Sequence, residues 1–247
     1  MKPLVAALGL SSALAALALA STAQAYRPFD GTDADVAEKG TIELELGPVG
    51  YYGRASHHYL VAPATVINYG LIDRVELVLQ GFDFIDIDRG SPGPRARLLD
   101  TGLFAKVVLR KGCLQHGSGV SVATEIGPLL PTVNDQTTVG ASAGGIVTQC
   151  WGDVFAAHYN VVVNYSLTHN VDLFGGAIFE GPSYLRVRPV AELFVEQEFN
   201  VATTYSILLG VIWRAHEAVD LDVGLRAARI NAEGVGEVRL GLTWRFL

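Results

Sequence analysis

The chain has 247 residues, of which half are hydrophobic and only 17% are charged. Its formal net charge is −7 and its mean hydropathy is +0.31. An acidic chain offers no electrostatic surface for the phosphate backbone, so nucleic acid is excluded as a partner. The length allows one large domain or two small ones, and an all-β chain of this size is normally one domain.

The first 25 residues are predicted to be a secretory signal peptide. Lys2 supplies the positive start, residues 4–20 are almost entirely apolar, and Ala23 and Ala25 are the small residues of a cleavage site. We expect cleavage before Tyr26, and the alternative is an uncleaved N-terminal membrane anchor. Residues 26–40 are assigned to a short periplasmic segment, and residues 41–247 to the folded domain.

After residue 25 the chain alternates apolar and polar residues with a period of two, which is typical of β-strands. In the last segment Val238, Leu240 and Leu242 share one face, while Arg239 and Thr243 share the other. No 3.6-residue stripe occurs, so almost no helix is expected. Twelve strands are predicted, at about 41–47, 58–69, 73–84, 100–110, 118–131, 138–151, 154–166, 171–180, 185–198, 203–214, 218–229 and 235–247.

The surplus of apolar residues indicates how these strands are arranged. No apolar run after residue 25 approaches the ~20 residues of a transmembrane helix. In a transmembrane β-barrel, lipid is the solvent for one face of every strand. We therefore predict a single antiparallel transmembrane β-barrel in the bacterial outer membrane, with both chain ends in the periplasm.

The predicted connections test this topology. The longest break, Ile85 to Leu99, joins the third and fourth strands and would be extracellular. The break Leu167–Asn170 is very short for an outer loop, which leaves the strand count open by two.

Aromatic residues gather near the ends of even-numbered strands, where the topology puts the periplasmic interface. An interfacial girdle predicts this clustering, because these rings are apolar with a polar tip. The girdle set is Tyr69, Trp151, Trp213, Trp244 and Phe246.

The C-terminal strand ends in an aromatic pattern of the kind that the barrel-assembly machinery reads. Phe246 is penultimate here and Leu247 is last, so the pattern is displaced by one residue. The implied partners are the barrel-assembly machinery, outer-membrane lipid, lipopolysaccharide and small organic solutes; no cofactor is expected.

Charged residues at inward positions are the main candidate site. They could form a ring that selects solutes, or a salt-bridged interior that locks the strands together; the near balance of signs favours the second. The set is Glu43, Glu45, Arg74, Glu76, Lys106, Arg110, Arg186, Arg188, Glu192, Glu196, Arg214, Asp220, Asp222, Arg226, Glu237, Arg239 and Arg245.

Cys113 and Cys150 are the only cysteines, and both are expected at the periplasmic end. The periplasm is oxidising, so a disulfide across the fifth strand is one interpretation. Two strand spacings, about 9.6 Å, exceed the usual Cα separation, so two free thiols remain the alternative. His116 has ligand-like spacing from Cys113, but no fourth zinc ligand is evident, so no metal is expected.

Three further motifs have possible functional interpretations. His57 and His58 are interpreted as a solvated pair rather than metal ligands. The carboxylates of Asp83, Asp86 and Asp88 could bind a cation that bridges lipopolysaccharide, but their spacing is not that of a calcium loop. The Gly-x-Ser-x-Gly match at residues 140–144 lies within a predicted strand with no helix after it, so it is not a nucleophile elbow.

Several segments, in order along the chain, resemble a family of outer-membrane proteins named for the meta-pathway of phenol degradation. They are residues 27–34 (RPFDGTDA), 38–40 (EKG), 43–45 (ELE), 68–77 (NYGLIDRVEL), 180–182 (EGP), 188–192 (RPVAE) and 222–226 (DVGLR). The resemblance implies a barrel and the passage of small organic molecules. It implies no catalytic or binding residues.

Three functions follow as hypotheses. The first is a channel or transporter for small solutes, including aromatic or apolar ones. The second is a closed structural or surface barrel. The third, an outer-membrane enzyme, would need a nucleophile and a base together at one rim, and no such pair is identified.

Overall fold

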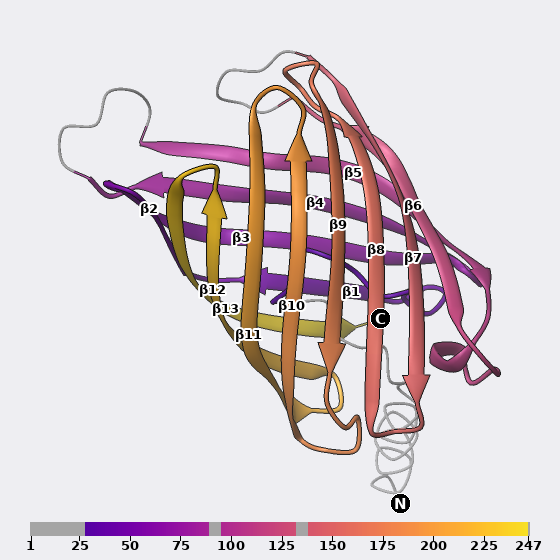
Figure 1. Ribbon diagram of the computed structural model, residues 1–247. Helices are drawn as coiled ribbons and strands as arrows, with labels where there is room; N and C mark the ends of the chain where they lie inside the picture. Colours follow the sequence, from indigo (N-terminus) through magenta and orange to yellow (C-terminus); the bar gives the residue numbers. More distant parts are fainter. Residues whose placement is uncertain (1–27, 89–94, 132–137, 247) are drawn as a thin grey trace, which may run out of the picture.

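The computed structural model describes residues 28–88, 95–131 and 138–246, and the predicted signal peptide lies outside these residues. The described residues form one antiparallel sheet of thirteen strand segments (Figure 1). The segments are β1 (Ile42–Gly47), β2 (Gly50–Arg54), β3 (His57–Ile72), β4 (Val75–Asp86), β5 (Ala96–Arg110), β6 (Ser121–Leu129), β7 (Gly140–Trp151), β8 (Phe155–Tyr165), β9 (Val171–Glu180), β10 (Val187–Glu198), β11 (Ala202–His216), β12 (Val219–Ile230) and β13 (Glu233–Phe246).

The sheet closes on itself as a barrel. Both β1 and β2 lie between β13 and β3, and each pairs with both of them. The two segments are therefore one barrel strand, interrupted at residues 48–49, where Pro48 has no N–H to give to a ladder. The barrel has twelve strands, as predicted, and its first strand runs beyond the expected residue 47 to Arg54.

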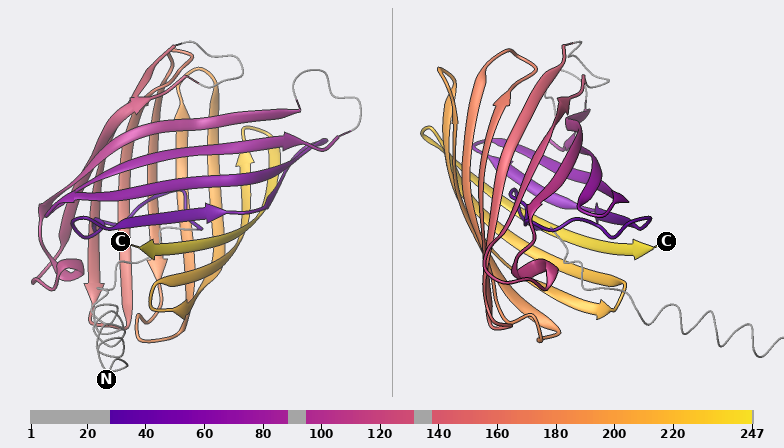
Figure 2. Two further views of the ribbon diagram at one scale, coloured as in Figure 1. Left: turned by 180° about the vertical axis from the view of Figure 1, so that it is seen from behind. Right: turned by 90° about the vertical axis from the view of Figure 1, so that its right-hand side faces the viewer.

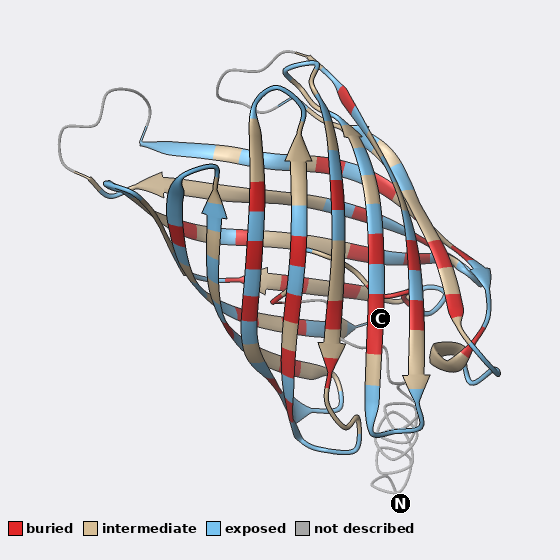
Figure 3. Ribbon diagram, viewed as in Figure 1, coloured by how far each residue is buried: buried red, intermediate tan, exposed pale blue. Residues whose placement is uncertain are grey.

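Alternation along each strand separates the interior from the outer wall (Figure 3). On β11, the outward side chain of Tyr205 is 59% exposed, whereas the inward Leu208 is 1% exposed. Ile207 and Leu209 are likewise exposed on the outer wall. The period-two pattern thus places aliphatic and aromatic side chains on the outer wall, as in a barrel in lipid, whereas the interior holds both polar side chains and buried apolar ones such as Leu208.

The two ends of the barrel differ. We call the end at which β1 begins and β13 ends the terminal rim; there Ile42 pairs with Phe246, and short turns join β3 to β4, β7 to β8 and β11 to β12. At the opposite end, the loop rim, β4 ends at Asp86 and β5 begins at Ala96, and most of the predicted long break between them lies outside the described residues. The short β8–β9 connection closes as a turn, because the N–H of Ser166 donates to the carbonyl of Asn170 at 2.8 Å.

Within the described ranges the structure contains a single helical turn, the 3₁₀ element η2 (Cys113–Gln115) between β5 and β6. No helix in these ranges has the length and apolarity to cross a membrane. The expectation of almost no helix agrees with this part of the chain.

Candidate functional site

Residues 28–40, expected as a periplasmic segment, lie inside the barrel against inward-facing side chains (Figure 2). We call them the inner segment. They run from the wall at β12 and β13, across β10, β8 and β7, to β4 and β3, and lead directly into β1. The segment therefore crosses the interior of the barrel.

Side chains of the wall hold the first half of the inner segment by its backbone. The Glu192 carboxylate accepts hydrogen bonds from the N–H groups of Asp30 at 2.9 Å and Gly31 at 2.7 Å. Asn160 Oδ1 accepts one from the N–H of Thr32 at 3.0 Å. Glu192 is 1% exposed, so these hydrogen bonds are shielded from water, and a hydrogen bond is stronger in such an environment than in water.

The second half is held in the same way from the other side of the barrel. Thr148 Oγ1 accepts a hydrogen bond from Ala34 at 3.1 Å, and Glu76 Oε2 accepts one from Ala37 at 2.6 Å. The segment then passes over Gly70 of β3, where a Cβ atom would lie 1.9 Å from the carbonyl oxygen of Glu38. Only glycine allows the two backbones to approach so closely.

Ion pairs add to these backbone contacts. Asp30 lies 3.0 Å from Arg239 and 3.8 Å from Arg226, and Asp33 lies 3.6 Å from Lys106. Both arginines also pair with a wall carboxylate, and Lys106 lies 3.4 Å from Glu76. The inner segment thus supplies part of the counter-charge for three basic side chains of the barrel interior.

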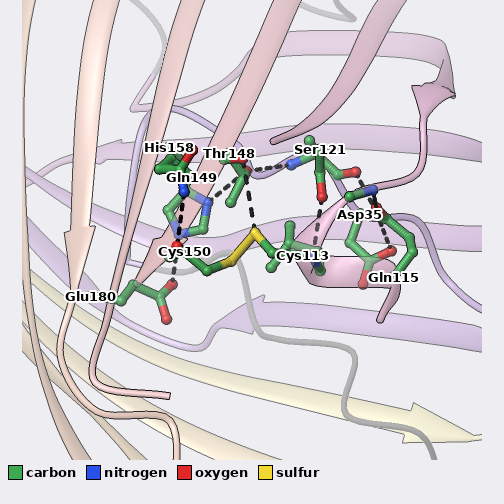
Figure 4. The surroundings of a disulfide bond; sticks show 12 residues. Asp35, Cys113, Gln115, Ser121, Thr148, Gln149, Cys150, His158 and Glu180 are labelled. Carbon is green, nitrogen blue, oxygen red and sulfur yellow. Dashed lines mark hydrogen bonds and ion pairs between the residues drawn. A yellow bond between two sulfur atoms is a disulfide. The ribbon is translucent and has the colours of Figure 1, made fainter. Parts of the chain in front are cut away.

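A disulfide between Cys113 and Cys150 secures η2 to β7 (Figure 4), with a Cα separation of 6.0 Å. The sequence left this pairing open because the cysteines flank an intervening strand; the turn leans inward and brings them within range. Gln115 Nε2 donates to the carbonyl of Ala34 at 2.8 Å and to Asp35 Oδ1 at 3.0 Å. The disulfide-bonded turn therefore contacts the inner segment from the terminal rim.

A cavity of about 900 Å³ occupies the interior between the inner segment and the β8–β9 turn at the loop rim. One side of it is aromatic, with the rings of Tyr52 and Phe84 5.8 Å apart and those of Tyr52 and Tyr59 6.0 Å apart. Its lining also includes four carboxylates outside the described ion pairs, Asp100, Glu125, Asp172 and Glu196. Of these, only Glu196 is among the lumen charges predicted from the sequence.

Fourteen of the seventeen predicted lumen charges lie in the barrel interior or at its edge. Several link neighbouring strands, as when Arg245 pairs with Glu43 at 2.7 Å and with Asp220 at 3.0 Å. The fourteen are Glu43, Glu45, Glu76, Lys106, Arg188, Glu192, Glu196, Arg214, Asp220, Asp222, Arg226, Glu237, Arg239 and Arg245.

Arg74, Arg110 and Arg186 are instead exposed at the terminal rim. Arg74 lies in the β3–β4 turn with φ +75°, Arg110 ends β5 after a register shift, and Arg186 precedes β10. At the end of a strand the alternation stops fixing which way a side chain points, so these three lie outside the interior.

The five girdle aromatics are exposed on the outer wall, and each lies within a few residues of the terminal rim. Trp151 contacts Phe155, and Trp244 contacts Phe246, with ring centroids 5.4 Å and 5.0 Å apart. An aromatic band at a membrane interface requires exposed rings near one rim, and the girdle stays a prediction.

The remaining motifs have local roles. The His58 ring contacts Asp88 Oδ1 at 2.8 Å, and this hydrogen bond holds the pKa of Asp88 below its ordinary value. Asp86 accepts a hydrogen bond from the N–H of Asp88. Among the described residues no three potential ligands are arranged to hold a metal ion. Ser142 of the Gly-x-Ser-x-Gly match lies within β7 and lines the cavity, and a strand follows it.

No family model matches the chain, and no curated protein matches it. Solved structures do resemble it. An outer-membrane channel from Pseudomonas putida F1 aligns with a TM-score of 0.66 over 88% of this chain and 100% of its own, at 10% identity. The KdgM porin aligns with a TM-score of 0.54 over 84% of this chain and 99% of its own, also at 10% identity. The porin's complex with disordered oligogalacturonate gives 0.55 over the same shares. The chain therefore has the closed antiparallel barrel fold of these outer-membrane proteins.

Proposed function

We propose that this chain is an outer-membrane channel for small solutes, closed in this conformation by the inner segment. The observation that carries the proposal is the cavity of about 900 Å³, which is lined at the loop rim by the β8–β9 turn and deeper in the barrel by residues 28–33 and 35–37 of the inner segment. A structural barrel needs no such space. Two barrels with a similar fold are a channel and a porin, which supports the same class of function.

Single-channel conductance tests the proposal. The folded chain in a planar bilayer is expected to give rare, brief current steps, because the inner segment is held by both walls. A variant lacking residues 28–38 keeps β1 (Ile42–Gly47) whole and should give long openings of larger conductance. Folding of both proteins is checked by the gel shift on heating. A folded deletion variant that passes no current would overturn the channel.

We further propose that the solutes are small and aromatic. The contacts among Tyr52, Tyr59 and Phe84 give the cavity an aromatic side, and the family that the sequence resembles is named for phenol degradation. Phenol should block the current of the deletion variant at lower concentration than cyclohexanol does. Replacing Tyr59 and Phe84 by leucine should remove that difference, whereas the surface substitution Tyr184→Leu should preserve it.

A closed structural barrel is the second candidate, and one observation favours it. Arg245 connects Glu43 of β1 with Asp220 of β12, and Arg226 connects to Glu237 of β13 at 2.9 Å, so ion pairs tie neighbouring strands together. This role predicts that the deletion variant folds, stays impermeable, and loses stability when Arg245 is replaced by methionine.

Export and orientation complete the proposal: the signal peptide is removed before Tyr26, the assembly machinery recognises the C-terminal strand, and the terminal rim faces the periplasm. Mass spectrometry of the mature chain tests the cleavage. For orientation, Ala232→Cys in the β12–β13 turn should react with an impermeant maleimide in intact cells, whereas Glu217→Cys in the β11–β12 turn should react only after lysis.

A further inference from the structure

The outer wall of the barrel has a hollow that the channel function does not use. It measures about 780 Å³ and extends over strands β8 to β12, with a lining that is almost entirely apolar. It lies on the face that the proposed function puts in contact with lipid, and the inference below rests on that placement.

Small residues create the hollow and large ones border it. A Cβ built on Gly175 of β9 would meet no atom within 4 Å, so the wall is thin at this point. Ala177 follows on the same outward face, while the exposed rings of Tyr159 on β8 and Tyr205 on β11 stand on either side. The result is a groove bordered by two aromatic side chains.

Strand register gives the groove a direction. Arg229 pairs with Tyr205, Tyr205 with Val195, and Val195 with Gly175, so one lateral row joins them. Arg229 is the last residue but one of β12 at the loop rim, whereas Gly175 is the fifth residue of β9. The row therefore descends from the loop rim toward the middle of the wall, along the path of a lipid tail that enters from the outer leaflet.

The rim end of the groove is positively charged. Arg229 is exposed, and its Nε donates to the carbonyl of Asn231 at 3.0 Å. Its terminal nitrogens make no other hydrogen bond with described residues. A guanidinium at this height complements a phosphate, which it can bind through two parallel hydrogen bonds.

We propose that this groove binds one lipopolysaccharide molecule of the outer leaflet, with an acyl chain along Gly175 and Ala177 and a phosphate on Arg229. Apolar lining below and a single cation above match a lipid whose phosphates lie directly over its tails. The bound lipid fills the open space beside Gly175.

Two substitutions and a matched control test the site. Gly175→Leu fills the groove without a clash, because the position faces open space. Arg229→Gln removes the cation. Gly145→Leu is the control: Gly145 is also an exposed outward glycine with open space at its Cβ, but it lies on β7, outside the groove lining.

The measurement is native mass spectrometry of the full folded chain in detergent with purified rough-type lipopolysaccharide, and separately with phosphatidylglycerol. The wild-type chain and Gly145→Leu should retain one lipopolysaccharide, Gly175→Leu should lose it, and Arg229→Gln should weaken it by about tenfold, the equivalent of one charge-assisted contact. Equal retention by wild type and Gly175→Leu overturns the site, and equal retention of phosphatidylglycerol overturns the choice of lipid.

The conductance experiment separates this inference from the channel. Introduced into the variant lacking residues 28–38, Gly175→Leu should leave the current unchanged. Specific lipid retention by a barrel that never conducts would count against the channel alone, and a conducting barrel without specific retention would count against the lipid site alone.

Discussion

The N–H of Gly31 donates a hydrogen bond to Oε1 of Glu192 at 2.7 Å, although 161 residues separate them. This contact fixes the inner segment to β10 at a place where water does not reach the carboxylate. A buried N–H that loses its acceptor costs roughly 1–3 kcal/mol unless it returns to water. When the inner segment leaves its site, this N–H can donate a hydrogen bond to water instead.

Glu192→Ala should therefore raise the fraction of time that the channel is open. The N–H groups of Asp30 and Gly31 lose their acceptor, so the docked segment is destabilised relative to the undocked one. Single-channel records give the open fraction, and hydrogen exchange of residues 30–37 reports undocking directly. Glu196→Ala is the control, because Glu196 lines the cavity but makes no described hydrogen bond to the segment. An unchanged open fraction in Glu192→Ala would contradict the role of the inner segment as a gate.

Gly70→Ala should also release the inner segment, for a steric reason. The added Cβ would lie 1.9 Å from the carbonyl oxygen of Glu38, and backbone on both sides leaves little room to adjust. We expect faster hydrogen exchange of residues 34–40 and a higher open fraction, with the barrel still resistant to heat in the gel assay. Gly236→Ala, where a Cβ meets no atom within 4 Å, should behave like wild type.

Closure by the inner segment should weaken as the pH rises through about 6. Burial, together with the nearby Asp33 carboxylate, raises the pKa of Asp35 to about 6, although a hydrogen bond from Gln115 opposes the shift. A raised carboxyl pKa favours the docked state at low pH, and this contribution is lost as Asp35 ionises. The open fraction should be higher at pH 7.5 than at pH 5, and Asp35→Asn should reduce this difference. An open fraction that decreases as the pH rises would contradict this prediction.

Loss of the disulfide should destabilise the terminal rim locally, while the barrel stays folded. Replacing Cys113 and Cys150 by serine removes the link between η2 and β7, and a disulfide typically contributes about 2–4 kcal/mol. Gln115, which donates to Ala34 and Asp35, is then held less firmly. The melting temperature should fall, and exchange at residues 34–36 should rise, whereas strands β10 to β12 should remain protected.

The open pore should prefer cations. Without residues 28–38, the described residues that line the cavity still include eight carboxylates against five basic side chains, and Asp172 and Glu196 are among the carboxylates that lie outside the described ion pairs. In the variant lacking residues 28–38, the reversal potential in a KCl gradient should indicate preference for potassium. The double substitution Asp172→Asn and Glu196→Gln should reduce it, and Glu217→Gln on the terminal rim should leave it unchanged.

The strands were predictable because alternation is a local signal. On β9 the predicted and observed bounds are both 171–180, and β13 ends at Phe246 against a prediction of 247. The split of the first strand was not foreseen; the pairing of β2 with both β13 and β3 appears only in the closed barrel.

The inner segment could not be predicted from its own residues. Its backbone N–H groups bind side chains such as Glu192 and Thr148, which are more than 100 positions away and look like ordinary inward polar residues. Arg74 and Arg186 were misplaced because they lie beyond the ends of their strands. The disulfide between Cys113 and Cys150 forms because the turn that contains η2 bends inward, and the spacing of the cysteines along the chain does not predict this bend.

Because the inner segment continues without a break into β1, it is a ligand tethered to its own receptor. A short tether gives an effective concentration in the millimolar range, so a free peptide with the sequence of residues 28–40 could compete only at comparable concentration. Reclosure is then an intramolecular event that does not depend on how much protein the membrane holds. Any factor that keeps the pore open must bind the wall side chains that hold the inner segment, or hold the inner segment itself on the periplasmic side.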